Sequence, residues 1–121
     1  MTTATSDKSN LVQKLSTFNA HWSPKTVSLF NGHDVMVAKL KGQYHWHVHQ
    51  DTDDFFYVIK GSCRIELRDQ TVHLNEGDLY VIPKGVEHRP VEDEEAHIML
   101  IERSGTPNSG DEATAAKREF I

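Results

Sequence analysis

The stretch Tyr44 to Asp54, YHWHVHQDTDD, gathers side chains that bind metal ions. His45, His47 and His49 occupy alternate positions, and three aspartates follow within the next five residues. Imidazole nitrogens and carboxylate oxygens are usual protein ligands of iron, manganese, nickel and zinc. The stretch therefore indicates either a metal site or a polar strand face that happens to be rich in imidazole.

Short β-prone runs separated by turn residues should position this stretch. The pattern predicts strands at residues 26–30, 34–40, 43–49, 55–60, 63–67, 70–74, 79–82 and 96–102. The acidic run Glu92–Glu95 lies between the last two and is interpreted as a solvated loop. Short strands with tight connections and no intervening helix predict an all-β fold, an antiparallel barrel or sandwich.

One short helix and two tails complete the expected organisation. Asn10 is a candidate N-cap, and Leu11, Leu15 and Phe18 have helical spacing. We expect residues 1–10 to form a flexible tail, residues 11–103 a single domain, and residues 104–121 an irregular C-terminal tail with a helical turn around 113–118.

Composition excludes several classes of partner. The net charge is -5, and no basic run breaks this acidity, so neither nucleic acid nor a membrane is an expected partner. Cys63 is the single cysteine, so no intrachain disulfide can form, and the opening residues lack the pattern of a secretory signal. We expect a cytoplasmic protein in which Cys63 faces inward as a small hydrophobe.

The strand expected after the histidines helps to choose between the two interpretations. On an extended strand the three histidines share one face, and the following segment, 55–60, is apolar on both faces. If the two strands pair, the histidines look into an enclosed space, where an unpartnered polar group costs about 1–3 kcal/mol. This favours a metal site. The outer apolar face then needs a cover, from a partner subunit or the N-terminal segment, and we expect a homodimer.

Two further residues could complete the ligand set. Asp54 follows His49 after a turn of four residues and would return beside it, whereas Asp51 and Asp53 are interpreted as solvated turn residues. His88 comes three residues after Gly85 in a Pro-x-Gly turn. Taken alone, His88 would more often be a surface histidine than a ligand.

Taken together, these residues resemble two motifs of the cupin superfamily, and in particular its small single-domain bacterial members. The first motif is matched by His47-x-His49, four residues, Asp54, six residues and Gly61. The second, Gly-x5-Pro-x-Gly-x2-His, is matched by Gly77, Pro83, Gly85 and His88. The resemblance extends over about residues 42–101.

The resemblance implies a small β-barrel, or jelly roll, that holds one divalent metal ion: iron, manganese, nickel or zinc. Its implied ligands are His47, His49, Asp54 and His88. Asp54 stands where cupins usually have glutamate and is one methylene shorter, so a site of three histidines with a water-bridged carboxylate is the alternative. His45 is expected beside the ligands, as lining of the pocket.

Two kinds of function follow from the resemblance. The first is a metal-dependent enzyme acting on a small organic molecule, of oxygenase, isomerase or lyase type, with Tyr44 and His45 as acid/base candidates. The absence of an Arg/Lys cluster from the motif region disfavours sugar-phosphate isomerisation. The second is a non-catalytic cupin that binds or senses a small molecule, with a structural or ligand-anchoring metal.

Overall fold

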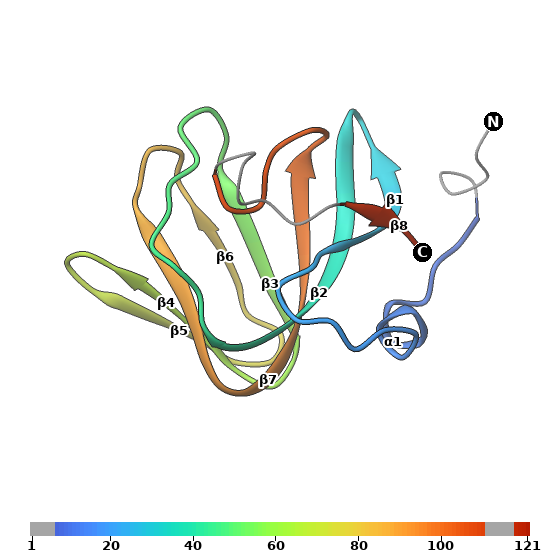
Figure 1. Ribbon diagram of the computed structural model, residues 1–121, viewed down its shortest axis with the longest axis horizontal. Coiled ribbons are helices and arrows are strands. Elements are labelled where there is room, and N and C mark those ends of the chain that lie inside the picture. Colours follow the sequence, from blue (N-terminus) through green and yellow to red (C-terminus); the bar gives the residue numbers. More distant parts are fainter. Residues whose placement is uncertain (1–6, 111–117) are drawn as a thin grey trace.

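The computed structural model describes residues 7–110 and 118–121 and consists mainly of strands (Figure 1). The elements are α1 (Leu11–Leu15), β1 (Lys25–Phe30), β2 (His33–Gln43), β3 (Asp54–Lys60), β4 (Cys63–Leu67), β5 (Thr71–Leu74), β6 (Leu79–Ile82), β7 (His88–Arg103) and β8 (Glu119–Phe120). The predicted all-β class is confirmed. No helix among the described residues is long and apolar enough to cross a bilayer.

Strand β7 is the element around which the sheet is built. The strand order is β5-β4-β7-β2-β1-β8, and β3 pairs with both β6 and β7. All pairings are antiparallel except the one between β1 and β8. Figure 1 shows β7, in orange, descending beside β4, bending at the bottom of the molecule and rising again beside β2. This long bent strand joins the parts of the sheet into one open barrel.

Alternating side chains of these strands form the core inside the barrel. On β7, Ala96, Ile98 and Leu100 are buried, and the residues between them are half-buried. The main cluster comprises Met36, Ala38, Leu40, Phe56, Val58, Cys63, Ile65, Leu74, Ile82, Ile98 and Leu100. Full burial of one such aliphatic or aromatic side chain is worth about 1.5–3 kcal/mol, so this cluster is the main source of stability.

The N-terminal helix covers part of the outer face of the sheet. Its N-cap is Asn10, as predicted, and the Oδ1 of Asn10 accepts a hydrogen bond from the Gln13 amide at 2.9 Å. Leu15 packs against Val27 and Val37, and Ile59 of β3 joins the edge of this cluster. The N-terminal segment therefore supplies some of the cover that an apolar outer face needs.

The predicted strand at 43–49 is wrong. Strand β2 ends at Gln43, just after Gly42 adopts a φ of 85° and the register with β7 shifts. Residues 44–49 then make spaced backbone hydrogen bonds to residues 85–90 instead of a ladder. Their partner is therefore not the 55–60 segment, which pairs with β6 and β7. Only one bridge, between His47 and His88, has strand geometry.

The prediction of a loop at Glu92–Glu95 is also wrong, because these residues lie within β7. Asp93, Glu94 and Glu95 are exposed, but Glu92 is 2% exposed. The thiol of Cys63, which faces inward as predicted, donates to Glu92 Oε2 at 2.7 Å. A run of acidic residues resembles a solvated loop in sequence, yet strand alternation turns its first member into the barrel.

The C-terminal tail is not irregular throughout. Strand β8 pairs with the start of β1, and the Ile121 amide donates to the Thr26 carbonyl at 3.0 Å. The helical turn expected around 113–118 falls almost wholly in residues 111–117, and most of the expected N-terminal tail in residues 1–6, outside the described residues.

Replacing Glu92 with glutamine should change how stability depends on pH. Burial raises the pKa of Glu92 to about 7, although the Cys63 thiol and Arg64 counteract it, whereas the ordinary value is 4.5. Between these values the folded state holds the proton more tightly than the unfolded state, so wild-type stability falls as pH rises from 4.5 to 7. Glu92→Gln has no proton to lose. From pH 4.5 to pH 7, the difference in free energy of unfolding between the variant and wild type should therefore shift in favour of the variant by on the order of 3 kcal/mol. Urea denaturation at a series of pH values measures this difference.

The matched control is Glu94→Gln, which removes an exposed carboxylate from the same strand. Its free energy of unfolding should follow that of wild type at every pH. If the free energy of unfolding of Glu92→Gln also changed with pH in parallel with that of wild type, the buried carboxyl would not be holding a proton in the folded state.

Candidate metal centre

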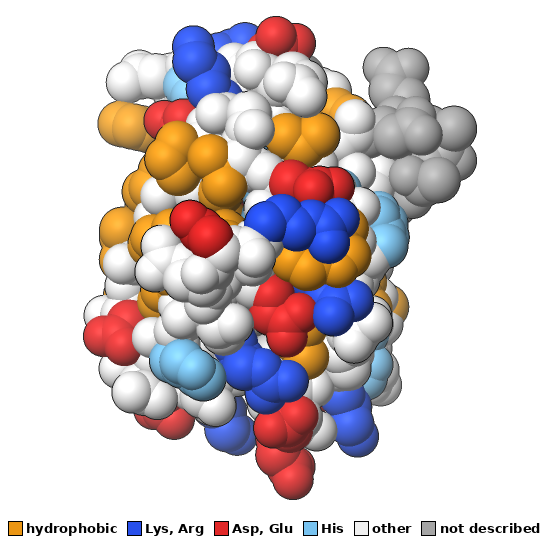
Figure 2. Space-filling model, turned by 90° about the vertical axis from the view of Figure 1, so that its left-hand side faces the viewer, with side chains coloured by type: hydrophobic (Ala, Val, Ile, Leu, Met, Phe, Trp, Pro, Cys, Tyr) orange, Lys and Arg blue, Asp and Glu red, His pale blue; other side chains and the backbone are white. Residues whose placement is uncertain are grey.

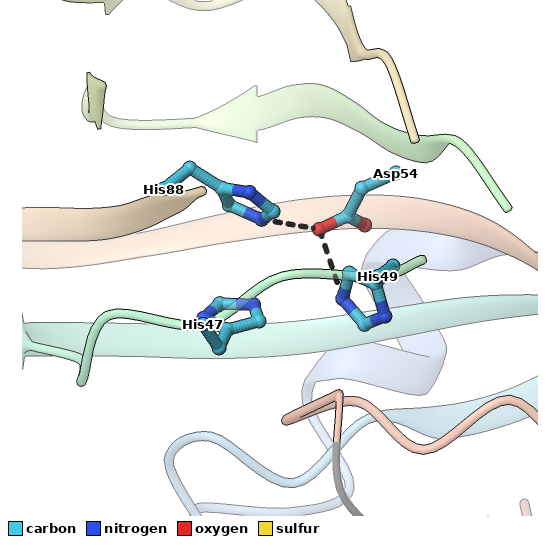
Figure 3. Close-up of side chains that lie close together, drawn as sticks. All are labelled: His47, His49, Asp54 and His88. Carbon is cyan, nitrogen blue, oxygen red and sulfur yellow. Dashed lines mark hydrogen bonds and ion pairs between the residues drawn. The ribbon is translucent and has the colours of Figure 1, made fainter. Parts of the chain in front are cut away.

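Four potential metal ligands converge inside the barrel (Figure 3). His47, His49, Asp54 and His88 each offer one donor atom, and all these atoms lie within 4.8 Å of one another. All four residues are buried. Asp54 of the first sequence motif and His88 of the second are 34 positions apart in the chain, so the two motifs meet at this point.

Backbone hydrogen bonds hold the two motifs against each other. The His47 amide donates to the His88 carbonyl at 3.0 Å, and the His88 amide donates to the His47 carbonyl at 2.9 Å. A third bond, 2.8 Å long, runs from the Gly85 amide to the His49 carbonyl. Gly85 has a φ of 81°, a left-handed conformation that glycine adopts without strain. Asp54 and His88 are the first residues of β3 and β7, so ends of the core strands fix their positions.

The other nitrogen of two of the imidazoles is occupied by the backbone. His47 Nδ1 lies 3.0 Å from the His45 carbonyl, and His88 Nδ1 lies 2.9 Å from the Val86 carbonyl. A carbonyl only accepts, so each Nδ1 carries the proton and donates it. In His47, Nε2 then keeps its lone pair, which is the form in which imidazole binds a metal, whereas His88 Nε2 lies against Asp54 Oδ2 and can donate to it until a metal takes the place of the proton.

The carboxylate of Asp54 reaches the imidazoles despite its short side chain. Its Oδ2 lies 2.9 Å from His88 Nε2 and 3.4 Å from His49 Nε2. Burial acts to raise the pKa of Asp54, but its bonds to His49 and His88 outweigh burial and lower the pKa. Asp54 is therefore an anion within contact distance of two ring nitrogens.

The surroundings shift the pKa values of His47 and His49 in opposite directions. Burial lowers the pKa of His47 to about 4, and nearby His88 adds to this effect, so this imidazole is neutral at pH 7. Burial also disfavours charge on His49, but the Asp54 carboxylate, 3.4 Å from its Nε2, prevails and raises its pKa. His49 Nε2 is fully buried, and no hydrogen bond of good geometry satisfies it among the described residues.

These observations test whether a metal fits. A buried nitrogen without a hydrogen bond, two imidazoles oriented through Nδ1 and one carboxylate form a donor set of three nitrogens and one oxygen. Such a set suits iron, manganese, nickel or zinc. The residues present fit a divalent ion.

A cavity opens beside these ligands. Its wall includes His47 and Asp54, and with its mouth it encloses about 390 Å³ of empty volume. The remaining lining residues are Trp22, Pro24, Ala38, Leu40, Tyr44, Phe56, Pro90, Ile98, Leu100, Glu102 and Asn108. The wall is mostly apolar, as the walls of small-molecule pockets usually are.

Comparison with known proteins identifies the family. The cupin domain model Cupin_2 matches residues 35–102, more than half of the chain. The chain belongs to the cupin family. The resemblance predicted from the two motifs is thus confirmed.

Proteins similar to this cupin include two small bacterial proteins and a fungal enzyme. A cupin-2 domain containing protein from Shewanella frigidimarina is 46% identical, with a TM-score of 0.77 over 78% of this chain and 92% of that one. Uncharacterized protein YdbB of Bacillus subtilis is 35% identical, over 64% of this chain and 78% of its own. Acireductone dioxygenase of Phaeosphaeria nodorum is 30% identical, over 63% of this chain and 46% of the enzyme. The chain therefore spans less than half of that dioxygenase.

The two residues predicted for acid/base chemistry occupy different places in this cupin. Tyr44 forms part of the cavity wall, and its hydroxyl accepts a hydrogen bond from Asn108 Nδ2 at 3.4 Å. Burial, helped by the charges of Glu102 and Asp54, raises the pKa of Tyr44, so it keeps its proton. The His45 side chain is exposed and lies against the Tyr44 ring, with the ring centroids 4.2 Å apart. Among the described residues it is not part of the cavity wall.

One residue of the cavity escaped the sequence analysis. Glu102 is 2% exposed and belongs to the wall. Burial and the charge of Asp54 raise its pKa to about 8, while His49 and Arg118 act to lower it. The signal was present, because in a strand Glu102 falls on the same face as the apolar residues Ile98 and Leu100.

Removal of any of the four candidate ligands should weaken metal binding strongly. Loss of partners that only orient a ligand typically costs about 10- to 100-fold in affinity, so His88→Ala and Asp54→Ala should each cost more than roughly 100-fold. Zinc binding to protein without a histidine tag can be measured by isothermal titration calorimetry. His73→Ala is the control, since His73 is an exposed histidine of β5. Wild-type affinity in Asp54→Ala would instead indicate the site of three histidines.

Proposed function

We propose that this cupin is a metal-dependent enzyme that acts on a small organic molecule. One divalent ion, of iron, manganese, nickel or zinc, would be held by His47, His49, Asp54 and His88. The observation that carries the proposal is the meeting of four buried donor atoms at the wall of an apolar cavity. The similarity to an acireductone dioxygenase supports an oxygenase, while isomerase and lyase chemistry stay within the proposal.

The ion and the protein would have different roles in the reaction. When bound, the ion supplies a Lewis acid or an oxygen-activating centre. Phe56, Ile98 and Leu100 keep that side of the cavity apolar, which excludes water and strengthens electrostatic interactions with a ligand. The hydrogen bonds from Nδ1 of His47 and His88 to backbone carbonyls fix the orientation of each ring, so that Nε2 would face the ion.

Tyr44 is the group that we propose for proton transfer. Its hydroxyl keeps its proton and belongs to the wall of the cavity, so it can donate to a ligand beside the metal ligands. The proposed acid/base role of His45 has less support, because its side chain is exposed. Its backbone carbonyl does serve the site, by orienting His47.

Turnover by the metal-loaded protein tests the proposal. Tag-free protein loaded separately with iron, manganese, nickel or zinc would be incubated with a panel of small organic molecules. Oxygen consumption and mass spectrometry of the products would separate oxygen addition from isomerisation and bond cleavage. Tyr44→Phe should lower kcat/KM by about 100-fold, as expected for loss of a general acid, without changing metal affinity.

Tyr57→Phe is the matched control, since Tyr57 lies in β3 but not in the cavity wall. Ligand binding without turnover under any metal would contradict the enzyme. It would favour the second function, a non-catalytic cupin that binds or senses a small molecule.

We also propose a homodimer that covers the outer face at β6. Among the residues that the structure describes, this strand pairs only with β3, and Leu79 and Val81 in it are 53% and 39% exposed. An apolar sheet edge of this kind favours association. Sedimentation velocity should give a dimer for wild type and a monomer for the double variant Leu79→Lys, Val81→Lys. Val12→Lys, at an exposed position of α1, should leave the dimer intact. A monomeric wild type would contradict the proposal.

A further inference from the structure

Glu102 brings a second carboxylate into the cavity, in addition to Asp54. It is the penultimate residue of β7 and is almost completely buried. Its register partner on β2 is Asp34, which also carries a carboxylate. A buried carboxylate that forms part of a cavity wall needs hydrogen-bond donors, either from the protein or from a ligand.

The protein supplies a donor to only one of its oxygens. Arg118 Nη2 lies 3.3 Å from Glu102 Oε1, whereas it donates to the Thr106 carbonyl at 2.6 Å, and Nη1 of the same guanidinium donates to Asp34 Oδ2 at 2.8 Å. Within residues 7–110 and 118–121, no hydrogen bond reaches Glu102 Oε2. This oxygen is therefore available to accept a hydrogen bond from a ligand in the cavity.

The charges around the cavity disfavour an anionic ligand. None of the described lining residues is lysine or arginine, and two, Asp54 and Glu102, are acidic. Burial raises the pKa of Glu102 to about 8, but the charge of a bound divalent ion would lower it, so that two carboxylates would balance the ion. Arg118 and Asp34 form an ion pair with each other. A carboxylate or phosphate group would find no guanidinium or ammonium partner here, and Glu102 would repel it.

Two aromatic side chains form another part of the wall. The rings of Trp22 and Tyr44 stack with centroids 4.7 Å apart and an interplanar angle of 22°. The Trp22 indole is held in place because its Nε1 donates to the Lys41 carbonyl at 3.0 Å. A rigid aromatic surface facing apolar side chains suits the body of a planar ring.

We propose that the cavity selects a small uncharged ring that carries hydroxyl groups. The ring would pack against the Trp22–Tyr44 pair, and one hydroxyl would donate its proton in a hydrogen bond to Glu102 Oε2. The inference concerns the cavity of the proposed function and names its class of ligand, but it does not depend on turnover.

The two tryptophans of the chain allow a direct binding measurement. Trp22 belongs to the cavity wall, whereas Trp46 lies outside it, between the guanidinium groups of Arg68 and Arg89 at 3.8 and 4.9 Å. Figure 2 shows the side of the molecule that carries β4 and β5, where basic and acidic side chains alternate above hydrophobic ones. In the Trp46→Phe background, indole fluorescence reports on the cavity alone.

Two probes of similar size separate the ligand classes. Catechol is an uncharged ring with two hydroxyl groups, and benzoate is a ring with a carboxylate. Each would be titrated into the Trp46→Phe protein, both zinc-loaded and metal-free, the latter at a pH above 8, where Glu102 is ionised without a metal. We expect catechol to bind about tenfold more tightly than benzoate, a difference of about 1.4 kcal/mol. Adding Glu102→Gln should bring the two affinities close together, because it weakens catechol binding and removes the repulsion of benzoate.

Glu94→Gln is the control, because it removes one negative charge from the same strand at an exposed position. It should leave the preference for catechol unchanged. Equal affinities in the Trp46→Phe protein, or a preference that survives Glu102→Gln, would overturn the inference. If thermal denaturation shows that Glu102→Gln does not fold, the ratio of the catechol and benzoate affinities in the Trp46→Phe protein still tests the inference.

Failure of this inference is distinguishable from failure of the proposed function. Zinc binding together with equal probe affinities would refute the selection of an uncharged ring and leave the metal-dependent enzyme standing. Absence of zinc binding would refute the metal centre, whereas the preference measured in metal-free protein would still test the role of Glu102.

Discussion

The reciprocal pair of backbone hydrogen bonds between His47 and His88 is the constraint on which the site depends. Neither residue is held by a ladder on both sides, yet each donates to and accepts from the other. The pair brings a segment without strand structure against the first residue of β7. Main-chain bonds of this kind depend little on side-chain identity. The framework of the site would therefore persist while residues of the cavity wall vary.

Preorganisation follows from the same arrangement. The carbonyls that fix Nδ1 of His47 and His88 belong to residues two positions earlier in the chain, His45 and Val86. The same short stretches thus place each imidazole and set its tautomer. Because burial keeps His47 neutral, while the contacts with His49 and His88 keep Asp54 anionic, a divalent ion would meet these two residues already in the required protonation states.

Much of the fold and the ligand set could be predicted from the sequence. Alternation gave the bounds of β4 and β6, and the spacing of the two motifs singled out the four residues that converge. Prediction failed where tertiary structure overrides local pattern. The segment 44–49 alternates like a strand, but Gly42 ends the ladder before it begins. Glu92 looks solvated among its acidic neighbours, and only the path of β7 shows that it turns inward. Glu102 could have been found, had the alternation of its strand been followed to the end.

Strand β7 has a consequence for how the molecule comes apart. It pairs with β2, β3 and β4, which lie far from it in sequence, so no part of the sheet is complete without it. A barrel built in this way is expected to exchange its core amide hydrogens through one cooperative opening rather than strand by strand. His88, the first residue of that strand, places the metal centre where local fraying of β7 would begin. An ion bound there would hold the start of β7 in place, and it would slow amide hydrogen exchange even in β2.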